Sequence, residues 1–156
     1  MKNNSIIILI DTLQQKIRVL DQIIASNQEQ KSAAETTDWD AFEKILDQKD
    51  QLIAEINHLD SGFQTFYDSI REEILKNRSQ YAEEIQKLQE MISHIVEQDV
   101  TIRSQEQRNK KLIEEMSLRE RKELKERKVA TKRAVSFYQN AANNRITEPR
   151  FLDKKK

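Results

Sequence analysis

Apolar residues near the start of the chain recur at alternating steps of four and three. The series runs through Ile6, Ile10, Leu13, Ile17, Leu20 and Ile24. Its mean period of about 3.5 residues is that of a coiled-coil seam, in which every second step returns to the same helix face. The pattern predicts a helix from about residue 6 to about residue 30 that buries one narrow apolar stripe.

A second helical pattern begins after a short stretch that lacks this period. Residues 31–38 have no large apolar side chain, and Thr37 with Asp40 three positions later matches a capping box, which marks a helix start. Apolar residues at helical spacing then run from Phe42 to Leu59. The only glycine of the chain, Gly62, follows and predicts a bend or a short break in the helix.

A third pattern extends from residue 63 to about residue 140 without glycine or proline. It predicts one very long helix, and at about 1.5 Å per residue a stretch of 60 residues spans roughly 90 Å, more than the first two helices cover. Asp99, Glu106 and Asn109 interrupt its apolar positions. They indicate either a polar layer that fixes the helix register or the point at which the helix leaves its partners.

These patterns predict an all-α protein: an antiparallel up-and-down helical bundle or coiled coil with a long C-terminal helix and a mobile tail. We expect a helical bundle domain at residues 1–118 and a basic helical arm with a flexible tail at 119–156. The composition agrees, because strong helix formers dominate and the 156 residues include one glycine and one proline.

The same composition excludes most enzymes and cofactor sites. Phosphate-binding loops and nucleophile elbows need several glycines, and the chain has no cysteine to act as nucleophile or zinc ligand. Glu55 and His58 form one Glu-x-x-His pair, but a di-iron bundle needs two, and His94 follows Met91 at the equivalent spacing. We therefore expect neither catalysis nor a bound metal or cofactor.

The longest apolar run bears on location. It covers residues 6–10 and ends at Asp11, which is too short for a signal-peptide core or for the roughly 20 residues of a membrane span. The lack of cysteine is compatible with a reducing compartment. The sequence predicts a cytoplasmic protein that does not insert into a membrane.

Charge is distributed unevenly, although the formal net charge is zero. Residues 1–102 carry a net charge of −9 and residues 103–156 carry +9, with much of the excess between 119 and 133. This stretch is either a solvated helix with internal ion pairs or an electrostatic docking surface for an acidic partner. The candidate docking residues are Arg121, Lys125, Lys128 and Lys132. Interleaved acidic residues and the lack of closely spaced aromatic side chains disfavour nucleic acid.

Apolar residues also occur in the polar C-terminal end of the chain. Val135, Phe137 and Tyr138 precede the polar run 140–144, and Phe151 and Leu152 precede three lysines. These side chains either fold back on the bundle, bind a partner by coupled folding, or are exposed without a role.

Stretches in order along the chain resemble the FlgN/FliT-type flagellar export chaperones of bacteria. They are TTDWDAF at 36–42, KDQLIAEINHLD at 49–60, ISHIVEQDVTIR at 92–103, and AVSFY at 134–138 with the terminal FLDKKK at 151–156. Each stretch alone is of a kind common in helical proteins. Their order and their spread over most of the chain make the likeness more specific.

The resemblance implies a small helical cytoplasmic chaperone that holds late flagellar substrates before type III export. Its partners are then hook-associated proteins, as for FlgN, or the filament cap protein, as for FliT. The family's C-terminal substrate-binding region, carried onto this chain, corresponds to Val129, Val135, Phe137 and Tyr138, with Phe151 and Leu152 as a second anchor. The length departs from FliT, whereas Asp99 and the terminal motif are more like FliT than FlgN.

Two other functions and the oligomeric state stay open at this stage. The chain is alternatively a structural coiled-coil adaptor or regulator that contacts the export ATPase or the export gate through its basic segment. A nucleic-acid-binding regulator is a weaker alternative for the reasons given above. A homodimer is compatible with the pattern, as is a monomer.

Overall fold

The computed structural model describes residues 4–123, which form three α-helices and no strand. Helix α1 spans Ser5–Glu35, α2 spans Trp39–Lys76 and α3 spans Ala82–Glu123. Short turns at 36–38 and 77–81 connect them. For this part of the chain, the predicted all-α helical bundle is confirmed.

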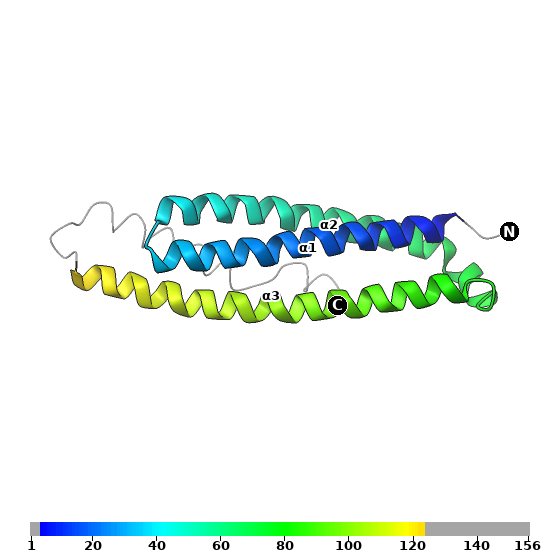
Figure 1. The fold of residues 1–156 in the computed structure, drawn as a ribbon. Helices are drawn as coiled ribbons and strands as arrows, with labels where there is room; N and C mark the ends of the chain where they lie inside the picture. Colours follow the sequence, from blue (N-terminus) through cyan, green and yellow to red (C-terminus); the bar gives the residue numbers. More distant parts are fainter. Residues whose placement is uncertain (1–3, 124–156) are drawn as a thin grey trace.

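The three helices run up, down and up along one long axis (Figure 1). Helices α1 and α3 are therefore parallel, and α2 is antiparallel to both. Each of α2 and α3 packs along α1, whereas α2 and α3 approach each other more sparsely. The C-terminal end of α3 continues past the turn that joins α1 to α2 (Figure 1).

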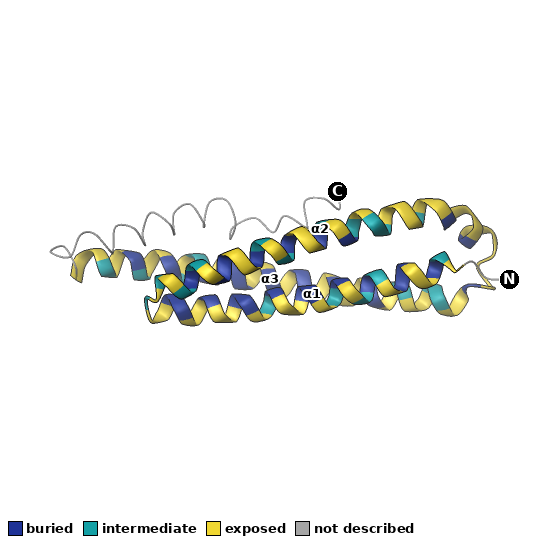
Figure 2. Ribbon diagram, turned by 90° about the horizontal axis from the view of Figure 1, so that it is seen from above, coloured by how far each residue is buried: buried dark blue, intermediate teal, exposed yellow. Residues whose placement is uncertain are grey.

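Helix α1 buries two neighbouring rows of side chains because it has a helix on each side. The predicted seam is buried or half-buried along its length. A second row, one heptad apart at each step, is also buried and consists of Leu9, Lys16, Ile23 and Gln30. Figure 2 shows the buried positions along the facing sides of the helices.

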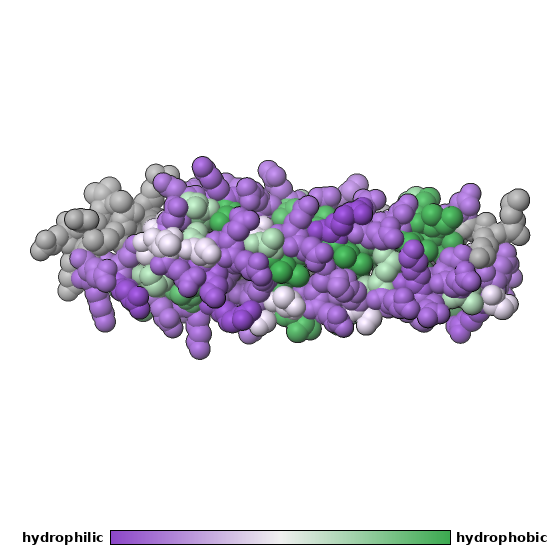
Figure 3. All heavy atoms as spheres, in the orientation of Figure 1, coloured by the Kyte–Doolittle hydropathy of each residue, from purple (hydrophilic) through white to green (hydrophobic). Residues whose placement is uncertain are grey.

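The core is a chain of three apolar clusters. The central cluster includes Leu20, Ile23, Ile56 and Ile102. A second, at the end where α1 meets α2, contains Ala33, Ala34, Phe42, Ile45, Leu46 and Ile113. A third, at the opposite end, contains Ile6, Leu9, Ile70, Ile74 and Tyr81. Hydrophilic residues cover most of the face in Figure 3, as expected for so thin a core.

The predicted boundary between the first two helices was wrong in two respects. Helix α1 continues to Glu35, because the small side chains of Ala33 and Ala34 pack in the second cluster although they lack the seam's large residues. The N-cap of α2 is Asp38, whose carboxylate accepts a hydrogen bond from the Ala41 N–H at 3.1 Å. Thr37 lies outside the helix with φ of 54°, so it does not form the predicted capping box.

The predicted break at Gly62 was also wrong. Helix α2 is continuous from Trp39 to Lys76, and Gly62 lies within it with a negative φ. A Cβ atom built at this position meets no atom within 4 Å. The helix therefore continues through residue 62, and the space around this position does not require glycine.

The very long helix predicted from residue 63 is divided by a chain reversal. Residues 63–76 belong to α2, and the turn at 77–81 leads into α3. Tyr81 closes the turn: its ring is buried in the third cluster, and its hydroxyl donates to Glu73 Oε2 at 2.6 Å. The reversal lets α3 bury an apolar face against α1, which a straight continuation would leave in water.

The structure describes the boundary that was predicted between the bundle and its C-terminal arm. Helix α3 passes through Leu118 and Arg119 without a break and reaches Glu123. Most of the predicted segment 119–156 lies outside the described residues, so the domain division stays a prediction. No helix between residues 4 and 123 combines the length and apolarity that a membrane crossing requires.

Candidate protein-binding surface

A buried polar layer fixes how the three helices meet. Lys49 of α2 donates to Gln30 Oε1 of α1 at 3.1 Å, and its Nζ lies 3.9 Å from Glu106 Oε1 of α3. All three side chains are almost fully buried, and the layer separates the central apolar cluster from the second. A mismatched register would leave these groups unpaired in the core, so the layer favours a single alignment.

Burial shifts the ionisation of both charged groups in the layer. It raises the pKa of the Glu106 carboxyl to about 7, against the opposing effect of the nearby Lys49 and Arg103 cations. It also lowers the pKa of Lys49, against the effect of the Glu106 and Asp50 carboxylates. Desolvation outweighs the ion pair for each group, because neither has water to stabilise its charge.

Side-chain amides align α3 with α1. Gln98 and Gln105 donate to the backbone carbonyls of Ile17 and Ile24 at 3.0 and 3.1 Å, one heptad apart on each helix. Asn109 donates to the carbonyl of Asn27 at 2.8 Å. The Asn27 amide donates in turn to Gln105 Oε1 at 3.1 Å. These bonds hold the two parallel helices in register and fix which face of α3 is left outside.

The interruptions predicted at Asp99, Glu106 and Asn109 are thus part of the bundle interior. All three residues are buried, so the helix does not leave its partners at this point. Further along, Glu120 accepts a hydrogen bond from Trp39 Nε1 at 2.9 Å, which ties the last turn of α3 to the start of α2. Only beyond this contact does α3 lack a neighbour among the described residues.

The outer face of α3 carries an exposed row of apolar side chains. Ile92, Val96 and Val100 are 47%, 54% and 63% exposed, and their spacing of four places them on one side of the helix. Ile92 has the helical spacing of the buried apolar residues around it, but it lies outside the core. The core side of the same turns is formed by Met91, Ile95 and Ile102. Helix α3 therefore has two apolar rows in this region, and only the row that faces the core is buried.

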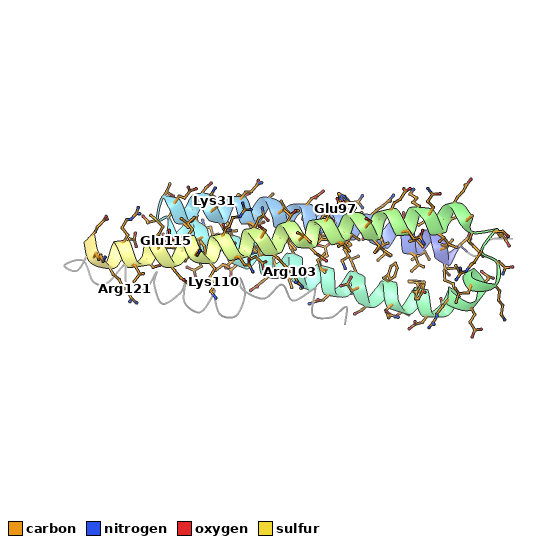
Figure 4. The ribbon with its side chains drawn as sticks, turned by 90° about the horizontal axis from the view of Figure 1, so that it is seen from below. Lys31, Glu97, Arg103, Lys110, Glu115 and Arg121 are labelled. Atoms are coloured by element: carbon orange, nitrogen blue, oxygen red, sulfur yellow. The ribbon has the colours of Figure 1, made fainter. Side chains whose placement is uncertain are left out.

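The row continues into basic side chains toward the C-terminus. Arg103 follows Val100 by three positions and is exposed, and Lys110 lies two turns further on. In Figure 4 both leave α3 along one edge of the helix, whereas Glu97 and Glu115 lie along the other. The outer face of α3 thus changes from apolar to cationic along its length.

Most of the partner-binding residues predicted from the sequence lie outside the described part. This holds for Val129, Val135, Phe137, Tyr138, Phe151 and Leu152, and for the docking residues Lys125, Lys128 and Lys132. Arg121 is described: it is exposed in the last turn of α3, beside Lys122. Of the predicted residues, only Arg121 can therefore be placed relative to the exposed row on α3, and that row was not predicted from the sequence.

The described residues hold no cluster of three side chains suited to a metal ion. Glu55 and His58 are both exposed on α2. An exposed surface of helix faces is instead suited to binding another protein, through apolar side chains framed by charge.

Comparisons with known proteins add no family to this picture. No family model, no curated protein and no solved structure matches the chain.

Proposed function

We propose that this protein is a cytoplasmic flagellar type III export chaperone. The observation that carries the proposal is the ordered set of stretches resembling FlgN/FliT-type chaperones, at 36–42, 49–60, 92–103 and 134–138 with 151–156. The first three fall on the α1–α2 turn, the middle of α2 and the middle of α3. A narrow helical bundle with a long third helix is compatible with such a chaperone.

The proposed substrates are hook-associated proteins or the filament cap protein. The chaperone would hold their polymerising helical termini and so prevent premature assembly before delivery to the export apparatus. Burial of Val129, Val135, Phe137 and Tyr138 would supply affinity, at about 25 cal/mol per Å² of apolar surface removed from water. Phe151 and Leu152 would form a second anchor, and the basic residues would select an acidic partner.

The proposal predicts that Phe137→Ala with Tyr138→Ala abolishes substrate capture. Loss of two aromatic anchors removes the largest apolar contribution to the contact. The measurement is co-purification of each candidate substrate with the tagged full-length chain, alongside circular dichroism to confirm unchanged helicity. The matched control is Asn143→Ala with Asn144→Ala, which alters the same segment without removing apolar surface.

Capture that survives the aromatic substitutions would remove this segment as the binding site. Failure of every hook-associated and cap protein to co-purify with the unaltered chain would refute the chaperone proposal itself.

A coiled-coil adaptor that contacts the export ATPase or gate is the second candidate. The exposed Arg121 and Lys122 at the end of α3 favour it, because they begin the basic segment. A salt titration separates the two functions. An adaptor held by charge should lose its partner steeply between low and moderate salt, whereas an apolar chaperone contact should not.

A further inference from the structure

The two halves of α3 are held against the bundle by different kinds of contact. In residues 82–102, apolar side chains pack into the central and third clusters; they are Ile85, Leu88, Met91, Ile95 and Ile102. In residues 103–123, the buried residues are Gln105, Glu106, Asn109, Ile113 and Ser117, and only Ile113 is apolar. Leu112 adds a half-buried contact beside it. The second half of α3 therefore gains little from the hydrophobic effect.

Polar atoms at this contact are also buried without a hydrogen-bond partner among the described residues. They include Asn27 Oδ1 and Gln30 Nε2 of α1 and Glu106 Oε2 and Ser117 Oγ of α3. Each of these atoms loses its hydration without replacement, which costs free energy in the closed bundle. The Lys49–Glu106 pair, at 3.9 Å, is removed from water as well, and such a pair is often no more stable than an apolar contact of the same size. Water would reach all of these groups if the second half of α3 moved away.

At the same end of the molecule, α1 and α2 meet through apolar side chains. Ala33 and Ala34 of α1 lie in one cluster with Phe42, Ile45 and Leu46 of α2. The short turn at 36–38 also joins these two helices covalently. The last turn of α3 is tied to the hairpin by the hydrogen bond from Trp39 Nε1 to Glu120. Separation at this end therefore costs less between α3 and the hairpin than between α1 and α2.

We infer that residues 103–123 of α3 open from the α1–α2 hairpin as one unit while the rest of the bundle stays folded. Ile102 is fully buried in the central cluster and ends the part of α3 that stays in place. A released helix of about 20 residues lacks the packing that stabilises helices in proteins, so its backbone amides then exchange with solvent. The open state uncovers Phe42, Ile45 and Leu46. The opening does not depend on the proposed chaperone function.

Hydrogen–deuterium exchange of the full unaltered chain tests the opening. Rates for each peptide are divided by those of an unstructured chain at the same pH. Residues 105–117 should share one degree of protection, because a single opening equilibrium exposes them all. This protection should be about tenfold or more below that of residues 86–100 on the same helix and of residues 43–56 on α2.

Replacement of both members of the buried pair tests the cause of the opening. Lys49→Met with Glu106→Leu removes the two charges without leaving either one unpaired, so the closed state should be favoured. Exchange of residues 105–117 should slow by about tenfold or more. The matched control is Lys16→Met with Asp60→Leu, which replaces an ion pair of 2.7 Å between α1 and α2. This control should leave the exchange of residues 105–117 unchanged.

A single cysteine detects an opening in which the released segment stays helical, because the natural chain contains no thiol. Ser117 is 4% exposed and close to cysteine in size, so the thiol of Ser117→Cys should react only in the open state. Its reaction should slow when Lys49→Met and Glu106→Leu are added. Leu118→Cys is the control: Leu118 is 57% exposed, so its thiol should react at the rate of a free thiol in every background.

Two results would overturn the inference. The first is protection of residues 105–117 equal to that of residues 86–100, with a Ser117→Cys thiol that reacts only on global unfolding. The second is protection that falls steadily from residue 105 to residue 123, because this describes fraying of a helix end and not one unit. An apolar pair that leaves both exchange and thiol reaction unchanged would show that the buried charges do not weaken this contact.

Discussion

Glu106 and Lys49 place two ionisable groups in the interior of the bundle, where buried side-chain amides also hold α3 against α1. The Lys49 ammonium has Gln30 and Glu106 as neighbours, whereas Glu106 Oε2 has no hydrogen-bond partner among the described residues. Such a pair contributes little net stability, because the loss of hydration offsets the attraction between the charges. Its effect is to penalise other registers and to make the fold respond to pH.

The pH response has a definite sign. The pKa of Glu106 rises from an ordinary 4.5 to about 7 in the folded chain, so the folded state holds the proton more tightly than the unfolded state. The resulting stability is fully present below about pH 4.5 and is lost as the pH rises through about 7, by on the order of 3 kcal/mol. Glu106→Gln should abolish this loss, as measured by urea unfolding between about pH 5 and pH 8.

The exposed carboxylate of Glu97, on the same helix, gives the control. Glu97→Gln should keep the decline of the unaltered chain. If Glu106→Gln declines as steeply as the unaltered chain, the carboxyl in the buried layer is not responsible for the pH response.

At the scale of the helices, the period of apolar residues predicted which segments are helical better than it predicted where each helix ends. The seam from Ile6 to Ile24 is buried or half-buried as predicted, and α2 carries the predicted apolar face. Glycine was a poor guide to helix ends, because α2 runs through Gly62. The real reversal at 77–81 has a weaker local signal, the polar run Asn77-Arg78-Ser79-Gln80, and depends on Tyr81 entering the core.

Gly62→Ala should stabilise the protein by about 0.5–1 kcal/mol. Alanine loses less backbone freedom than glycine on folding, and the site has room for a Cβ atom. The reverse change at the exposed helical position Ala54, Ala54→Gly, should destabilise by a similar amount. Urea midpoints at constant slope measure both, and a destabilised Gly62→Ala variant would mean that α2 needs a bend at this point.

At the scale of the whole molecule, the three described helices share one line of apolar clusters. The buried residues of all three apolar clusters come from residues 6–113, and the polar layers join the same three helices. The partner-binding residues predicted from the sequence belong instead to the end of α3 and the residues after it. We therefore expect that stability and the proposed binding function can be separated along the chain.

A chain ending after Glu123 should therefore fold. Circular dichroism should show that residues 4–123 remain as helical as they are in the full chain. The melting temperature should stay within a few degrees of that of the full chain, because the truncation removes no residue of the three apolar clusters. The truncated chain should no longer capture the proposed substrates. A chain ending after Lys76 is the contrasting control and should not melt cooperatively, because the face of α1 that binds α3 is then exposed. Loss of cooperative melting in the chain that ends after Glu123 would show that residues after 123 are part of the core.

Part of the candidate surface was accessible from the sequence and part was not. The separation of charge and the apolar residues of the C-terminal end can be read directly, and Arg121 is exposed as a docking residue must be. The row of Ile92, Val96 and Val100 was missed because Ile92 fits the same helical spacing as its buried neighbours. The spacing of residues shows that a helix has apolar rows, but it does not show how many of these rows pack against another helix.

Local composition and period are enough to predict that this protein is helical, thinly packed and divided in charge. Packing between the helices establishes where the chain reverses, which rows are buried, and that Glu106 and Asn109 lie inside. These outcomes depend on the number of helices beside each face: α1 has two neighbours and buries two rows, whereas α3 leaves one row exposed to water. No single helix carries that information, because burial is a property of the pair of surfaces that meet.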